Sequence, residues 1–120
     1  MSLRVYLYDT ETLTCECGKK HQIKQDECFS QNITHNLGAM ADEGGFYEAL
    51  WRPEEVGITQ AKQLIPILRK AIADMEDNPA RFEKHNAPNG WGLYEHFLPW
   101  LRKYLEACLQ YPEAVISVSR

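Results

Sequence analysis

The spacing of apolar residues changes once along the chain, within residues 32–53. Before this stretch the clearest pattern is an alternation, with Leu3, Val5 and Leu7 on one side of an expected strand. After it, apolar residues recur every three or four positions in two long segments, which is the spacing of amphipathic helices. A chain that begins as strand and continues as helix is expected to form an α+β domain.

A single domain is expected, because 120 residues with 44% hydrophobic content can bury one core but not two. Residues 1–31 form its strand-rich segment, and residues 32–120 form its helical part with a closing strand. The predicted sheet is small and mainly antiparallel. It contains a first strand over residues 3–8, a turn at Asp9-Thr10-Glu11, short strands over residues 12–17 and 21–24, and a last strand from Ala114 that pairs with the first.

Two long helices are predicted to cover one face of this sheet. Thr59 is the expected N-cap of the first helix, after a loop over residues 54–57, and the second helix runs over residues 93–110. Pro66 and Pro99 lie inside these segments and are expected to kink them, because proline lacks the N–H that a helix interior requires. Cys108 lies on the apolar face and is predicted to be a core residue.

A short bent helix is predicted at the change in pattern. Thr34 is a suitable N-cap, Gly44-Gly45 weakens the helix midway, and Pro53 ends it.

Asn32, His35 and Asn36 would then gather at the start of this short helix, where free N–H groups suit an anion or an acceptor oxygen. The simpler interpretation, which the sequence favours, is that the two asparagines close a turn and His35 is a half-exposed helix residue.

The N-terminal cysteines suggest a zinc site. Cys15, Cys17, His21 and Cys28 supply ligand types that tetrahedral zinc accepts, within fourteen residues. The spacing argues against it, since knuckle sites normally use Cys-x₂-Cys. Free thiols, or a turn at Gly18 that happens to lie between cysteines, are the favoured alternatives, and a disulfide is disfavoured for an intracellular protein.

Trp91 lies in a turn sequence, Pro88-Asn89-Gly90-Trp91-Gly92, between residues of little bulk. Packing at the edge of the core is the favoured prediction for this indole, because a large aromatic side chain contributes mainly through buried area. The alternative is that Trp91 forms the floor of a groove beside Asn32, His35 and Arg52.

The charge pattern excludes some classes of partner. The net charge of −4 is spread without a basic run, which argues against nucleic acid as a partner. Neither a membrane-spanning apolar run nor a signal peptide is recognisable, and a soluble cytoplasmic protein is expected.

The blocks Asn32-Ile33-Thr34-His35-Asn36-Leu37, Leu50-Trp51-Arg52-Pro53 and Asn89-Gly90-Trp91-Gly92, with a terminal Val-x-Val-Ser-Arg, resemble a family of small uncharacterised proteins of bacteriophages and prophages. This resemblance covers most of the chain from Asn32 onward and implies a setting in the bacterial cytoplasm. It implies no activity, cofactor or catalytic residue.

Three functions are compatible with these observations. The preferred one is an accessory module that binds an unknown protein or small ligand, because no complete catalytic motif is present. The alternatives are a small enzyme that uses His35 with Arg52, and an adaptor stabilised by zinc. The predicted binding residues are Asn32, His35, Asn36, Trp51, Arg52, Asn89, Trp91 and Tyr94.

Overall fold

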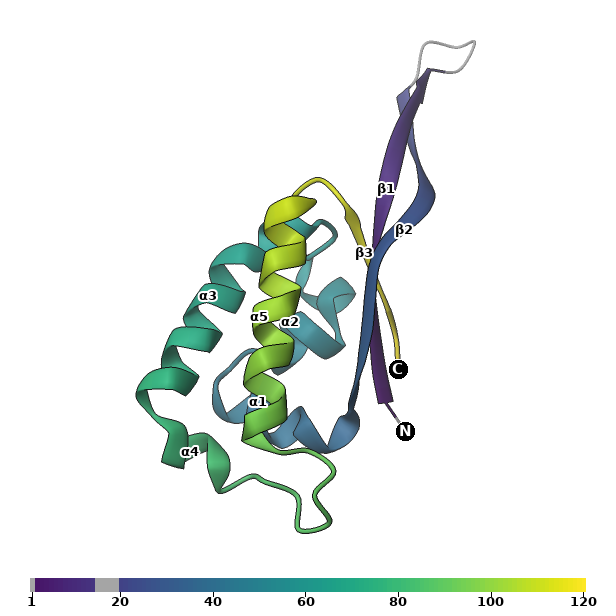
Figure 1. Cartoon of the computed structure of the whole chain (residues 1–120). Coiled ribbons are helices and arrows are strands. Elements are labelled where there is room, and N and C mark those ends of the chain that lie inside the picture. Colours follow the sequence, from purple (N-terminus) through teal and green to yellow (C-terminus); the bar gives the residue numbers. More distant parts are fainter. Residues whose placement is uncertain (1, 15–19) are drawn as a thin grey trace.

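A three-stranded antiparallel sheet forms one layer of the protein, and the helices lie on one of its faces (Figure 1). The computed structural model describes residues 2–14 and 20–120, with the side chains of residues 2–9 and 27–120. The strands are β1 (Ser2–Thr14), β2 (Lys20–Thr34) and β3 (Val115–Ser119), in the order β2-β1-β3. The α+β class and the pairing of the first strand with the last are therefore confirmed.

The central strand β1 follows the predicted alternation. Leu3, Val5 and Leu7 are fully buried and form the contribution of β1 to the core. Tyr6 and Tyr8 lie on the other face, where their rings stack 5.8 Å apart. Burial of one side of the strand fixes the register, because a slip by one residue would expose all three apolar side chains.

The turn predicted at Asp9-Thr10-Glu11 is wrong. β1 continues through these residues to Thr14 and stays paired with β2, from Thr10 opposite Lys24 to Thr14 opposite Lys20. The polar residues coincide instead with two register shifts beside Tyr8, which interrupt the ladder without reversing the chain. The hairpin therefore projects beyond the helices, and the molecule measures 57 Å along its longest axis (Figure 1). The strand predicted over residues 21–24 lies within β2, while residues 15–17 lie outside the described residues.

The predicted short helix begins and breaks where expected. Its parts are η1 (His35–Leu37), α1 (Gly38–Glu43) and α2 (Tyr47–Trp51). The Thr34 hydroxyl accepts a hydrogen bond from the Asn36 N–H, as an N-cap does. The Gly44-Gly45 pair separates α1 from α2, and α2 ends immediately before Arg52-Pro53.

Thr59 is not the N-cap of the next helix. The predicted loop before it forms η2 (Pro53–Val56), and the helix α3 (Ala61–Asp77) starts after Gln60. Gln60 and Gln63 form a reciprocal capping box, and the Gln63 carbonyl oxygen also accepts the N–H of Thr59 at 2.8 Å. The glutamine pair takes the role that was predicted for Thr59.

The two long helices pack against each other above the sheet. α3 is followed by the short helix α4 (Pro79–Glu83), and α5 (Tyr94–Gln110) runs between α3 and the sheet (Figure 1). Both long helices continue past their prolines, Pro66 and Pro99. Cys108 is fully buried, as predicted, and its burial raises the pKa of the thiol to about 12. No helix in the described part of the chain is long and apolar enough to cross a membrane.

Candidate functional site

His35 and Trp51 form one link between the predicted binding residues. The Trp51 side chain is 2% exposed, and its Nε1–H donates to Nδ1 of His35 at 2.9 Å. The ring of Tyr47 stacks on Trp51, with ring centroids 5.3 Å apart. His35 therefore satisfies a buried donor that would otherwise have no partner, which is a structural role.

Asn36 links the same segment to the loop before α5. Its Nδ2 donates to the backbone oxygen of Trp91 at 2.7 Å. Gly92 packs directly against it, since a Cβ at Gly92 would lie 2.9 Å from the Cβ of Asn36. Gly92 also has φ +121°, a conformation that favours glycine. These contacts bring residues 34–36 and 87–92 together although they are far apart in sequence.

The Trp91 side chain lies on the surface, so the prediction that it packs at the core edge is wrong. The indole is 72% exposed. The backbone around it is nevertheless fixed: the Trp91 N–H donates to Oδ1 of Asn89 at 3.0 Å, and the Gly90 N–H donates to the oxygen of Ala87 at 3.0 Å. The Ala87 N–H in turn donates to the oxygen of Gly92 at 3.0 Å. The hydrogen bonds of the turn hold the backbone in place, and the ring remains exposed to solvent.

An open hollow of about 690 Å³ lies beside this turn. Its polar lining comes from Asn36, Lys84, His85, Asn86 and Asn89. Sequence reasoning missed Lys84, His85 and Asn86. Asn86 lies eight residues before Tyr94, and its Oδ1 accepts the N–H of Tyr94 at 2.8 Å where α5 begins, a contact that no local sequence pattern indicates.

Basic side chains next to the hollow gather around Glu43. Lys84, His85 and Arg81 approach its carboxylate at 2.9, 3.2 and 3.1 Å. The hydrogen bonds from Lys84, then from His85 and Arg81, lower the pKa of Glu43 to about 2. Arg81 and Lys84 carry two positive charges against the one negative charge of Glu43. This cluster therefore carries net positive charge, although the net charge of the chain is −4.

Besides Trp91, five of the predicted binding residues do not line the hollow: His35 and Trp51, described above, and Asn32, Tyr94 and Arg52. The backbone oxygen of Asn32 accepts from Nε1 of Trp100 at 3.1 Å, and the Asn32 side chain is exposed. The hydroxyl of Tyr94 donates to the oxygen of Met75 at 2.6 Å, and burial raises the pKa of this hydroxyl.

Arg52 donates a hydrogen bond to Glu55 at 2.8 Å, and this interaction raises the pKa of the guanidinium. Neither His35 nor Arg52 lines the hollow beside Trp91. The pocket that the enzyme hypothesis requires, with His35 facing Arg52, is not formed there. The start of η1 also lacks a free anion-binding N–H at Asn36, since the Thr34 hydroxyl accepts that hydrogen bond.

The residues predicted to bind zinc are described only in part. Cys15 and Cys17 lie outside the described residues, as does the side chain of His21. Cys28 is a free thiol whose Sγ donates to the oxygen of Leu7 at 3.3 Å, and its pKa is raised mainly by burial. Among the side chains that are described, no three acidic, histidine or cysteine residues cluster as metal ligands.

Comparison with known proteins adds no relative: no family model, no curated protein and no solved structure matches this chain. The site is therefore defined by geometry. We call the exposed indole of Trp91, its supporting residues Asn36 and Asn89, and the adjoining hollow the Trp91 surface.

Proposed function

We propose that this protein is a binding module that recognises another protein through the Trp91 surface. One observation carries the proposal: the indole of Trp91 is 72% exposed although the backbone on both sides of it is fixed by hydrogen bonds. Tryptophan is enriched among the residues that dominate binding energy in protein interfaces.

The energetic advantage of this arrangement has two parts. Burying the exposed 72% of Trp91 removes on the order of 110–180 Å² from water, which corresponds to roughly 3–4.5 kcal/mol before the costs of association. The loop is already ordered by Asn36 and Asn89, so less conformational entropy is lost when a partner binds. The polar groups of the hollow form the hydrated rim that surrounds such an anchor in protein interfaces.

A protein suits this surface better than a small molecule. Sites for small molecules enclose most of the ligand's area, whereas the hollow is open and Trp91 stands beside it. The resemblance to phage proteins makes bacterial cytoplasmic proteins the first partners to test. The positive charge near Lys84 favours an acidic surface on the partner.

The test compares Trp91→Ala with Leu109→Ala, a matched control that also removes an exposed apolar side chain, 47% exposed and on α5. Tagged protein captures partners from bacterial lysate, and the affinity of each purified partner is then measured by calorimetry. We expect Trp91→Ala to retain the fold and to weaken binding by about 30-fold or more, as hot-spot truncations do, while Leu109→Ala binds like the wild type. A partner that binds both variants equally well would disprove the role of this surface.

A further inference from the structure

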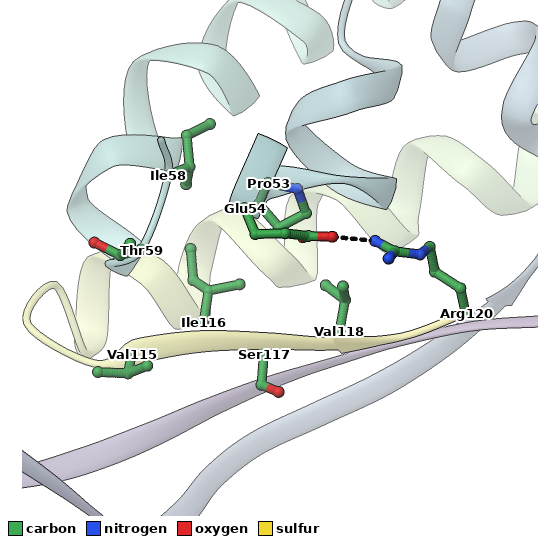
Figure 2. A pocket seen from close by; sticks show the side chains of 9 residues that line it. All are labelled: Pro53, Glu54, Ile58, Thr59, Val115, Ile116, Ser117, Val118 and Arg120. Carbon is green, nitrogen blue, oxygen red and sulfur yellow. Dashed lines mark hydrogen bonds and ion pairs between the residues drawn. The ribbon is translucent and has the colours of Figure 1, made fainter. Parts of the chain in front are cut away.

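A second surface feature is a groove of about 290 Å³ along the outer edge of β3. Its apolar wall is formed by Pro53, Ile58, Ile116 and Val118. Figure 2 shows that Ile116 and Val118 project from β3 toward η2 and the chain before α3, whereas Ser117 points to the opposite face. The groove therefore lies between an edge strand and the helical layer.

The backbone of β3 has unused hydrogen-bonding groups in this groove. Ser117 lies opposite Tyr6 of β1, and the Ile116 N–H donates away from β1, to the oxygen of Thr59 at 2.9 Å. Because orientation alternates along an antiparallel strand, Val118 also directs its N–H and C=O away from β1. Within residues 2–14 and 20–120, no backbone hydrogen bond reaches Val118 from that side. A donor and an acceptor thus face the groove together.

The other edge of the sheet, on β2, is hydrogen-bonded to helix α5. On β2, Nε1 of Trp100 donates to the oxygen of Asn32 at 3.1 Å, and the Gln31 side chain donates to the oxygen of Trp100 at 2.9 Å. Helix α5 therefore covers that edge at Gln31 and Asn32, beside the helical layer, which is a usual protection against unwanted strand pairing. On β3 the segment at Thr59 and Gln60 pairs only with the start of the strand, at Val115 and Ile116.

The charges at the groove determine the chemistry of an occupant. Glu54 and Arg120 line the groove, form an ion pair with each other, and so leave it without net charge (Figure 2). Arg120 also donates to the backbone oxygen of Trp51 at 2.8 Å, which holds the guanidinium in place. An uncharged segment with apolar side chains is complementary to a neutral groove with apolar walls.

We propose that the β3 edge binds an extended, uncharged segment of a partner protein by strand addition. The segment pairs with the N–H and C=O of Val118, in line with Thr59 and Gln60, and inserts an apolar side chain between Ile58 and Val118. Strand addition obtains affinity from backbone hydrogen bonds and specificity from such side-chain pockets. This surface is distinct from the Trp91 surface, and the inference does not depend on the role of Trp91.

The probe is a fluorescein-labelled hexapeptide of alternating threonine and valine, and the control peptide carries methyl groups on all its amide nitrogens. The protein variant is Val118→Pro, which removes the donor in the groove without removing a hydrogen bond to β1, as is tolerated on edge strands. Trp91→Ala is the matched control, since it changes only the other surface. Binding is followed by fluorescence anisotropy, and hydrogen exchange of the Val118 amide by NMR.

We expect saturable binding of the unmodified peptide, at least tenfold weaker binding to Val118→Pro, and unchanged binding to Trp91→Ala. The Val118 amide should exchange rapidly in the free protein and slowly in the complex, whereas the Ser117 amide is protected in both. If Val118→Pro does not fold, the methylated peptide tests the inference on the wild-type protein. It should bind at least tenfold more weakly than the unmodified peptide. No saturation up to about 1 mM, equal binding of both peptides, or a protected Val118 amide in the free protein would each overturn the inference.

Discussion

The hydrogen bond between His35 and Trp51 makes the sharpest prediction about stability. In the variant His35→Ala the Nε1–H of Trp51, on a side chain only 2% exposed, loses its acceptor. An unsatisfied buried donor costs about 1–3 kcal/mol. At about 2 kcal/mol the ratio of folded to unfolded protein falls roughly 30-fold. With an unfolding entropy of about 2.1 cal/mol/K per residue over 120 residues, the melting temperature falls by about 8 °C.

Urea and thermal unfolding, followed by circular dichroism, measure this loss. His35→Asn is the matched control, because its amide oxygen can occupy nearly the position of Nδ1 and accept the same hydrogen bond. We expect this variant to recover about half or more of the lost stability. In the Trp51→Phe background, which lacks the donor, the loss in free energy of unfolding caused by His35→Ala should be smaller than in the wild type by at least about 0.5 kcal/mol. Equal stability of the alanine and asparagine variants, or no coupling between the two positions, would refute the reasoning.

Three further predictions concern a charge, a turn and a thiol. The pKa of Glu43 is lowered from 4.5 to about 2, mainly by the hydrogen bond from Lys84. The ion pairs of Glu43 therefore stabilise the fold above pH 4.5, and this stabilisation is lost as the pH falls toward 2. In urea titrations, Glu43→Gln should be less stable than the wild type at pH 7 and should approach the stability of the wild type at pH 2. Gly92→Ala should lower the free energy of unfolding by about 2 kcal/mol or more, and calorimetry should show a smaller loss for Gly90→Ala. Both glycines have positive φ, but only Gly92 lies against another residue. Cys108, with its pKa raised to about 12, should remain unmodified by iodoacetamide in the folded protein and react after unfolding, as peptide mass spectrometry will show.

The sequence predicts those elements whose signals are local. The alternation of Leu3, Val5 and Leu7 locates the first strand, and the Thr34 cap with the Arg52-Pro53 stop bounds the short helices. The last strand also pairs as expected. For the first strand and the short helices, the pattern of burial or the backbone chemistry of a few neighbouring residues is sufficient.

The predictions from the sequence are wrong where contacts between residues far apart in the chain determine the local structure. Asp9-Thr10-Glu11 has the composition of a turn, but pairing with β2 keeps it extended. Trp91 has the size of a core residue, but Asn36 holds the loop on the surface and directs the indole outward. The β3 groove depends on which strand ends at the edge of the sheet, and a single sequence does not reveal this.

The order of the strands has a consequence for how the chain folds. β1 forms a ladder with β2, which is near in sequence, and a second ladder with β3, in which Val5 lies opposite Val118. Closing a loop of more than one hundred residues carries a large entropic cost, so contacts of this kind form slowly. We therefore expect the hairpin and the helices to assemble first and β3 to dock last, which leaves one side of β1 transiently open to aggregation during refolding.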